Sequence, residues 1–224
     1  MRLPRLSMPD VAHHVLLRGN NKEKLFLSSH DYQVYLQFLE ETASKNGCAI
    51  NAFCLMVDHV HLMVTPNGDG DVSKLMQTMG RKYTQYFNVR TNREGSLFSP
   101  RFKSALVDPD YELDVVRYIE TNPVRNKLEK SLDEFQWSSY RCHDSEHGDN
   151  DCFIKTPRAL QALSDCKVAR VKLYKKHCAE SLEVSLLQKI RHETLRSRVI
   201  GDEKFLRFVE KKCGVDLNSR RAML

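Results

Sequence analysis

The stretch Ala49-Ile-Asn-Ala-Phe-Cys-Leu-Met-Val57 and the stretch Val60-His-Leu-Met-Val-Thr65, separated only by Asp58 and His59, decide the fold. Both are short apolar runs of strand length, and almost nothing lies between them. Two such runs joined by so short a connection are typical of a β-hairpin. We therefore expect a hairpin in the core of a sheet.

The flanking sequence adds elements on both sides of this hairpin. Before it we expect a short strand, ended by the turn signal Gly19-Asn20-Asn21, and then a helix with apolar residues at helical spacing. After it we expect a second helix, an extended segment interrupted by Pro100, and a third helix that Pro123 breaks. In chain order these elements are His14–Arg18, Asp31–Ser44, Val72–Val89, Leu97–Val107 and Pro109–Asn122.

The resulting order is β-α-β-β-α-β followed by another helix. This order is typical of the ferredoxin-like split βαβ unit. We therefore predict an α+β fold, in which an antiparallel sheet carries helices on one face. Many unrelated activities use this fold, so the fold alone says little about function.

The last third of the chain differs in charge from the rest. Residues 1–150 hold 18 Lys and Arg against 20 Asp and Glu, a balance of −2, whereas residues 151–224 hold 17 against 9, a balance of +8. Apolar residues at helical spacing over Val168–Ile190 and Phe205–Val209 indicate amphipathic helices. We predict one domain over residues 1–150 and a small basic helical region over residues 151–224. The basic surface is either a solvated helical face or a contact for nucleic acid.

Composition also limits the cellular setting. No apolar run reaches the roughly 18 residues that span a bilayer, and the N-terminus does not resemble a secretory signal, so we expect a cytoplasmic protein. The seven cysteines are odd in number and show no Cys-x-x-Cys spacing, which favours reduced thiols over a disulfide framework. A zinc site at Cys142, His143, His147 and Cys152 is the alternative, although its spacing is unusual for zinc.

The sharpest local feature is Asp58-His59-Val60-His61. Side chains alternate between the two faces of a strand, so His59 and His61 point the same way and Val60 points into the opposite layer. Two imidazoles on one face can share a metal ion. Two ordinary histidines on a solvated strand face are the simpler alternative.

A second feature, Tyr118-Ile-Glu-Thr-Asn122, lies in the third predicted helix. Tyr118 and Asn122 are four residues apart, so they share one helical face. A phenol and a carboxamide there offer a nucleophile and a metal ligand in the last turn before Pro123. A core tyrosine followed by an asparagine that ends the helix is the alternative.

Five segments occur together in an order and spacing that one family also has. They are His59-Val60-His61, Tyr83-Thr-Gln-Tyr-Phe-Asn88, Arg101-Phe-Lys-Ser104, Arg117-Tyr-Ile-Glu-Thr-Asn-Pro-Val-Arg125 and Trp137-Ser-Ser-Tyr140. In these segments the chain resembles the REP-associated tyrosine transposases, which are single-tyrosine HUH transposases that process single-stranded DNA. The resemblance extends from about His13 to Tyr140.

The resemblance implies a ferredoxin-like core, in agreement with the order of elements. It implies that His59, His61 and Asn122 hold a divalent metal, Mg²⁺ or Mn²⁺, and that Tyr118 is the catalytic nucleophile. It further implies a single-stranded DNA hairpin as partner, and a covalent 5′-phosphotyrosine with a free 3′-hydroxyl as product. Related transposases include dimers, so a homodimer and a monomer both stay open.

Basic side chains after the predicted hairpin are candidates for following a DNA backbone. They are Arg81, Lys82, Arg90, Arg101, Lys103, Arg117 and Arg125. The aromatic residues Phe98, Phe102 and Trp137 either stack on bases or fill the core. Tyr83 and Tyr86 are rival nucleophiles, although their spacing favours core packing.

Three functions fit these observations. The first is a transposase that cuts and rejoins DNA through Tyr118, which the joint presence of both histidines, Tyr118 and Asn122 favours. The second is a non-catalytic module of the same fold that binds nucleic-acid hairpins. The third is a metal-dependent hydrolase that activates a water molecule instead of a tyrosine.

Overall fold

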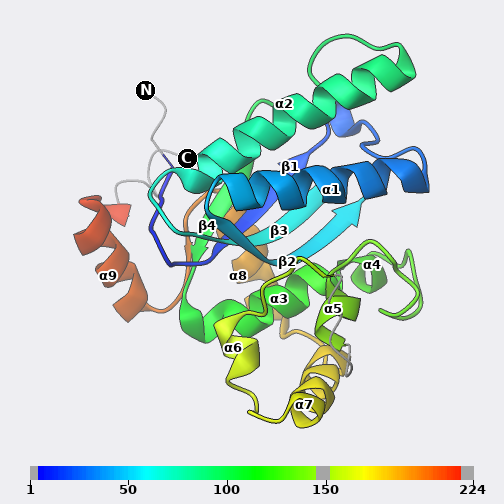
Figure 1. The fold of residues 1–224 in the computed structure, drawn as a ribbon. Helices are drawn as coiled ribbons and strands as arrows, with labels where there is room; N and C mark the ends of the chain where they lie inside the picture. Colours follow the sequence, from blue (N-terminus) through cyan, green and yellow to red (C-terminus); the bar gives the residue numbers. More distant parts are fainter. Residues whose placement is uncertain (1–4, 145–151, 218–224) are drawn as a thin grey trace.

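One mixed sheet organises the protein, for which a computed structural model describes residues 5–144 and 152–217. Within these residues, five strands lie in the order β2-β3-β1-β4-β5 (Figure 1). Their bounds are β1 His13–Arg18, β2 Cys48–Met56, β3 His59–Pro66, β4 Lys103–Val107 and β5 Val199–Ile200. The first four strands pair antiparallel, which confirms the predicted ferredoxin-like core.

The predicted hairpin is formed by β2 and β3. Met56 lies opposite His59, so Val57 and Asp58 alone make the turn, and the register shifts once near Asn51. In β3, Val60, Leu62 and Val64 belong to one apolar cluster and Met63 belongs to another on the opposite face. This alternation sends both histidines of β3 to the face that carries Met63.

The predicted helices on the first face are α1 Ser29–Lys45 and α2 Asp71–Thr91. Tyr35, Leu39, Leu75 and Met79 are fully buried between these helices and the sheet. Tyr83 is fully buried as well, and its hydroxyl donates to the carbonyl of Leu25 at 2.7 Å. Tyr83 is therefore a core residue of this layer.

Helices also cover the second face of the sheet. The sequence had predicted helices on one face only. Apolar side chains of β2 and β4, such as Cys54, Met56 and Val107, are buried there and need a cover. The helices on this side include α3 Glu112–Glu120, α4 Asn122–Arg125 and α8 Val184–Leu195. The remaining helical segments are η1 Asn20–Lys22, η2 Pro109–Tyr111, α5 Tyr140–Asp144, α6 Arg158–Gln161, α7 Lys167–Ala179 and α9 Glu203–Cys213.

The last third of the chain is mostly helical, as predicted, but it also completes the sheet. Strand β5 runs parallel to β4, with Leu106 opposite Val199 and Val107 opposite Ile200. The amide of Leu106 donates to the carbonyl of Arg198 at 3.0 Å, and the amide of Asp108 donates to that of Ile200 at 2.8 Å. A two-residue strand is too short for its sequence pattern to indicate it. None of the helices in the described residues is long and apolar enough to cross a membrane.

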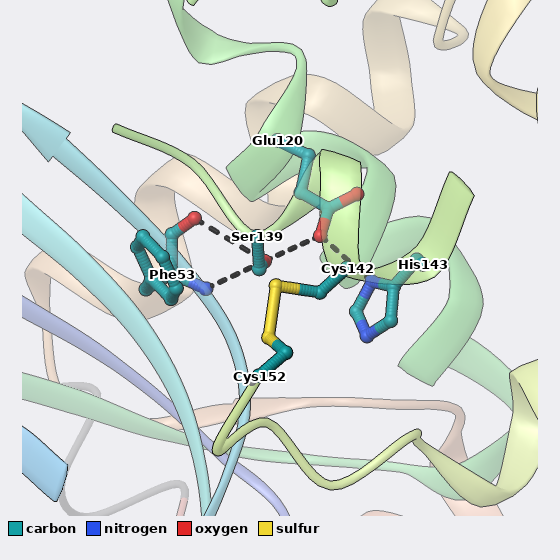
Figure 2. Close-up of a disulfide and its surroundings, with 6 residues drawn as sticks. All are labelled: Phe53, Glu120, Ser139, Cys142, His143 and Cys152. Carbon is teal, nitrogen blue, oxygen red and sulfur yellow. Dashed lines mark hydrogen bonds and ion pairs between the residues drawn. A yellow bond between two sulfur atoms is a disulfide. The ribbon is translucent and has the colours of Figure 1, made fainter. Parts of the chain in front are cut away.

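The expectation of reduced thiols is wrong for one pair, because Cys142 and Cys152 form a disulfide (Figure 2). The segment that follows Cys152 runs alongside β2, where the amide of Lys155 donates to the carbonyl of Ile50 at 2.8 Å. This path brings Cys152 next to Cys142. With both sulfurs bonded to each other, neither is available to zinc. His147, the other histidine of the zinc alternative, lies outside the described residues.

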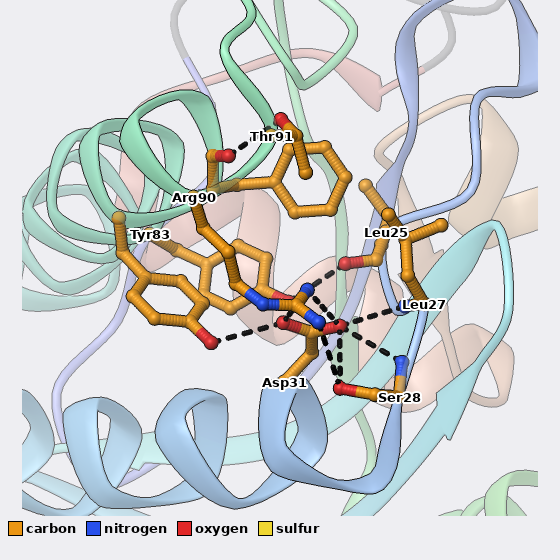
Figure 3. Close-up of polar contacts among 9 residues, drawn as sticks. Leu25, Leu27, Ser28, Asp31, Tyr83, Arg90 and Thr91 are labelled. Atoms are coloured by element: carbon orange, nitrogen blue, oxygen red, sulfur yellow. Dashed lines mark hydrogen bonds and ion pairs between the residues drawn. The ribbon is translucent and has the colours of Figure 1, made fainter.

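An ion pair between the buried carboxylate of Asp31 and the exposed Arg90 links α1 to α2 (Figure 3). Asp31 is fully buried and accepts hydrogen bonds from the amides of Leu27 at 2.8 Å and Ser28 at 2.9 Å. Arg90 donates to both its carboxylate oxygens, at 2.6 and 2.7 Å, and the Tyr86 hydroxyl donates at 3.0 Å. Burial alone raises the pKa of Asp31, but these bonds outweigh burial and lower the pKa below its usual 3.8.

We expect Asp31→Asn to lower the free energy of unfolding by about 2 kcal/mol at pH 7, because a carboxamide cannot accept all the hydrogen bonds that the buried carboxylate accepts. The stabilisation is present above the unfolded pKa and disappears as pH falls through the lower folded pKa. Urea denaturation at several pH values measures the loss of stability and its pH dependence. As a matched control, Glu41→Gln removes the exposed partner of Lys82, and we expect it to change the free energy of unfolding much less than Asp31→Asn does. Equal losses in the two variants would contradict this role for Asp31.

Candidate active site

The two histidines of β3 face the helices α3 and α8. Their ring centroids are 5.2 Å apart and the rings stand nearly perpendicular, at 82°. His61 is 5% exposed, whereas His59 is only partly buried. The placement of both rings on one face is the one that the strand alternation predicts.

Each of these histidines has one ring nitrogen held by a neighbour. Nδ1 of His59 lies 2.6 Å from Oδ1 of Asp58, and Nδ1 of His61 lies 2.8 Å from Nε2 of His14. Burial lowers the pKa of His59, and it lowers the pKa of His61 well below its usual value. Both rings are therefore neutral at pH 7, and the Nε2 atoms are the ones left for a ligand.

Tyr118 packs edge-on against two of these imidazoles. Its ring centroid is 5.8 Å from that of His61 and 5.5 Å from that of His14. The predicted third helix is in fact two helices, because α3 ends at Glu120 and α4 begins at Asn122. Pro123 sits in the first turn of α4, where its missing N–H costs no hydrogen bond.

Asn122 also reaches the histidines from the start of α4. Its side chain is 4% exposed, and its Nδ2 lies 3.4 Å from Nε2 of His59. Its Oδ1 accepts a hydrogen bond from Nδ2 of Asn126 at 2.6 Å. For Asn122 to ligate a metal, the carboxamide has to turn and exchange this bond, because the oxygen is the donor atom that a hard cation takes.

These side chains line a cavity of about 150 Å³. Three arginines also line it, namely Arg18 of β1, Arg125 of α4 and Arg191 of α8. The guanidinium of Arg125 lies 4.2 Å from the centre of the Tyr118 ring and donates to the Tyr118 carbonyl at 2.7 Å. Three cations around so small a cavity suit a phosphate group. The sequence had indicated only Arg125.

The residues present fit a divalent metal. Both His59 and His61 line the cavity, and their Nδ1 atoms are held by Asp58 and His14, which leaves the Nε2 atoms for a ligand; a carboxylate such as Asp58 is a usual support for a metal-binding histidine. With one carboxamide oxygen, this donor set suits Mn²⁺ as well as Mg²⁺. In the described part of the chain, no group of three or more His, Cys, Asp or Glu is placed to hold a metal, so a third protein ligand has to be a residue such as Asn122.

A fully buried carboxylate, that of Glu120, anchors α3 two residues beyond Tyr118 (Figure 2). It accepts hydrogen bonds from the hydroxyls of Ser139 and Tyr174, and it lies 2.8 Å from Nδ1 of His143. Tyr174 belongs to α7, so the last third of the chain supports the helix that carries the tyrosine. The sequence did not indicate this cluster, since its members are far apart in the chain.

Some of the predicted DNA-binding residues line a second, larger cavity of about 840 Å³ between α2 and the segment before β4. We call it the basic groove and define it by Arg5, Lys74, Arg81 and Arg101. Phe98 and Phe102 also line it, and the guanidinium of Arg5 lies 3.7 Å from the centre of the Phe102 ring. Lys103 is exposed at the start of β4.

The predicted DNA-binding residues Lys82, Arg90 and Arg117 form ion pairs or hydrogen bonds with other residues of the protein. Lys82 pairs with Glu41 at 2.8 Å, and Arg90 pairs with Asp31. Arg117 is 7% exposed and donates to Asp114 at 2.6 Å and to the carbonyl of His177 at 2.9 Å. Trp137 stacks on Tyr32 with a centroid distance of 4.5 Å. A role for these residues in DNA binding stays a prediction.

Comparison with known proteins gives a family match and likenesses to solved structures. The model of the family described as "Transposase IS200 like" matches residues 7–122, more than half of the chain. The chain is similar to a REP-associated tyrosine transposase solved bound to a REP hairpin, with 20% identity, a TM-score of 0.54, and coverage of 63% of this chain and 83% of that chain. This likeness shows a shared fold.

A second solved structure is that of a protein from Deinococcus radiodurans R1. It has 20% identity and covers 54% of this chain and 97% of that chain. Its TM-score is 0.38. No curated protein matches the chain.

Proposed function

The chain belongs to the family of IS200-like transposases, and from this premise we propose that it cuts and rejoins single-stranded DNA through a covalent bond to Tyr118. Membership of the family makes the protein an enzyme of DNA transposition. We propose three further points: the tyrosine mechanism, the metal, and a DNA hairpin as the substrate. One observation carries the proposal: Tyr118, His59, His61 and Asn122 line one cavity, although they come from β3, α3 and α4.

In the proposed reaction, the phenol oxygen of Tyr118 attacks the scissile phosphorus and displaces the 3′-oxygen of the preceding nucleotide. The phenol loses its proton, the departing oxygen gains one, and the 5′-phosphate stays bonded to the protein. A 3′-hydroxyl from another strand can then reverse the step and join. The phosphodiester energy is kept throughout, because one P–O bond is exchanged for another.

The surrounding side chains support each part of this step. A tyrosine has an ordinary pKa of about 10 and attacks poorly at pH 7 unless its anion is stabilised. The guanidinium over the Tyr118 ring, that of Arg125, supplies a positive charge for that purpose. Arg18 and Arg191 line the same cavity and are placed to hold phosphate oxygens.

We propose His59, His61 and Asn122 as the ligands of a divalent metal, Mg²⁺ or Mn²⁺. When bound, the ion would neutralise the scissile phosphate and orient it for in-line attack. The two histidines would use Nε2, and Asn122 would use its carboxamide oxygen after turning from Asn126.

We propose a DNA hairpin as the substrate, since the solved relative of the same fold is bound to a REP hairpin. The basic groove is the surface that would hold it. It combines arginines with the partly buried Phe102, whereas Phe98 at its edge is a core residue, and single strands are held by charge together with aromatic stacking.

We expect Arg101→Ala to weaken hairpin binding about 5-fold and to lower the slope of log affinity against log salt by nearly one unit, because one phosphate contact is lost. Fluorescence anisotropy with a labelled hairpin at several salt concentrations measures both. Lys82→Ala is the matched comparison, because Lys82 is paired with Glu41 and does not line the groove. If Lys82→Ala had the larger effect, DNA would lie elsewhere on α2.

The test of the proposed function is a covalent complex. A labelled hairpin oligonucleotide is incubated with the protein and Mn²⁺ and analysed on a denaturing gel, with and without chelator. We expect an adduct that requires the metal. Binding without any adduct would favour a non-catalytic hairpin-binding module, and cleavage without an adduct would favour a hydrolase that activates water.

A further inference from the structure

Helix α8 reaches the candidate metal site although it lies outside the residues that the family model matches. It packs against β1, β4 and β5. Thr194, in its last turn, is 1% exposed, and His14 of β1 is completely buried beside it. His14 in turn lies edge to edge with His61, with the ring centroids 5.0 Å apart and the ring planes 17° apart.

A continuous chain of hydrogen bonds joins α8 to His61. Oγ1 of Thr194 lies 2.7 Å from the carbonyl oxygen of Ile190 and 2.7 Å from Nδ1 of His14. Nε2 of His14 lies 2.8 Å from Nδ1 of His61. In the described residues, no hydrogen-bond partner is found at Nε2 of His61, which lines the cavity.

The number of protons in this chain leaves two arrangements. The Thr194 hydroxyl carries one proton, and each neutral imidazole carries one N–H. If the hydroxyl donates to Ile190, then Nδ1–H of His14 donates to Thr194, and Nδ1–H of His61 donates to Nε2 of His14. Nε2 of His61 then carries a lone pair into the cavity, as a metal ligand must.

In the other arrangement, every proton is reversed. The Thr194 hydroxyl donates to Nδ1 of His14, His14 donates from Nε2 to His61, and the proton of His61 sits on its own Nε2. A protonated Nε2 cannot ligate a metal. The hydroxyl of Thr194 is thus coupled to the ligand state of a histidine on another element.

We propose that Thr194 and His14 are positioning residues that hold His61 with a bare Nε2, ready for the metal; this rests on the proposed function. Three observations favour this arrangement. The hydroxyl is placed to donate to Ile190, a common bond for threonine in a helix. Arg18 and Arg125 line the cavity, and positive charges favour a lone pair over an N–H directed at them. Asp58 fixes His59 in the matching state, because a carboxylate can only accept the proton of Nδ1.

The first test needs no substitution. In the metal-free, full-length protein labelled with ¹⁵N, long-range ¹H–¹⁵N spectra distinguish a protonated Nδ1 from a protonated Nε2 in each histidine. We expect His14 and His61 both to carry the proton on Nδ1. A proton on Nε2 of His61 would overturn the proposal.

The second test measures Mn²⁺ binding by the metal-free protein with electron paramagnetic resonance. We expect Thr194→Val to weaken Mn²⁺ affinity about 10-fold, in the range found when a supporting partner of a metal ligand is removed. Thr194→Ser keeps the hydroxyl and is expected to retain the wild-type affinity. Unchanged affinity in a folded Thr194→Val protein would also overturn the proposal.

Thr91→Val is the matched control. The Thr91 hydroxyl makes the same kind of bond, to the carbonyl of Phe87 at 2.6 Å, in helix α2 on the other side of the sheet. We expect its Mn²⁺ affinity and histidine spectra to be those of the wild type. A loss equal to that of Thr194→Val would mean that the effect is general helix destabilisation, and would overturn the specific role of Thr194.

These outcomes separate the two proposals. If Tyr118 forms no DNA adduct but the spectra and the Mn²⁺ affinities behave as described, the proposed function alone fails. If the adduct forms and Thr194→Val binds Mn²⁺ like the wild type, the role of Thr194 and His14 alone fails.

Discussion

Tyr118→Phe is expected to abolish the covalent protein–DNA adduct, a loss of at least about 10³-fold, while hairpin binding stays within about 2-fold of the wild type. The substitution removes the phenol oxygen and keeps the ring. The ring contacts with His14, His61 and Arg125 are therefore retained, and so is the cavity around them. Denaturing gels measure the adduct, and anisotropy with the same labelled hairpin measures binding.

The matched control for this prediction is Tyr86→Phe. Tyr86 was a rival nucleophile in the sequence, and its hydroxyl donates to Asp31 on the other side of the sheet from the cavity. We expect the adduct to persist in this variant, with a modest loss of stability. If the adduct survived in Tyr118→Phe and disappeared in Tyr86→Phe, the nucleophile would be Tyr86 of α2 and not Tyr118.

His61→Ala is expected to lower the rate of adduct formation by at least about 10³-fold and Mn²⁺ affinity by more than about 100-fold. The reason is that the substitution removes one of the two imidazoles proposed as metal ligands and leaves His14 without its partner. Single-turnover kinetics with excess protein measure the rate, and titration with Mn²⁺ measures the affinity. A chelator added to the wild type is expected to reproduce the loss of activity.

His30→Ala controls for the removal of an imidazole as such. His30 is exposed in the first turn of α1, and its ring contacts Tyr86 on the far side of the sheet from the cavity. We expect this variant to cut DNA and bind Mn²⁺ as the wild type does. Full activity of His61→Ala with Mn²⁺ would contradict a metal role for His61.

The sequence was sufficient for the parts of the site that depend on local periodicity. Strand alternation places His59 and His61 on one face, and helical spacing places Tyr118 and Asn122 one turn apart. Neither pattern states that the two pairs meet. That they line one cavity follows from the packing of α3 and α4 over the hairpin.

The rest of the site depends on pairings that no local pattern contains. His14 meets His61 because β1 pairs with β3 in a register that places Leu16 opposite His61. Thr194 meets His14 across 180 residues of sequence. Thr194 and His14 are of residue types that occur throughout globular proteins, so only their positions in the folded chain distinguish them.

Contacts between segments that are far apart in the sequence also explain why the disulfide and the role of the basic region were not predicted. Counting cysteines and reading their spacing did not reveal that the chain returns beside β2 and brings Cys142 to Cys152. Likewise, the charge balance of +8 showed that the last third is basic, but not that Arg191 lines the cavity beside Tyr118.

The parallel pairing of β5 with β4 bears on how the protein is made. Until Val199 and Ile200 have left the ribosome, β4 presents an unpaired edge, and unpaired strand edges recruit other strands. The same holds for a chain cut near residue 150, which is expected to self-associate and would not report cleanly on DNA binding by the basic region. A nascent chain has the same exposed edge. Thr194 is added to the chain only shortly before Val199, which covers the edge of β4. The site is therefore completed and the edge of β4 is covered at almost the same moment of synthesis.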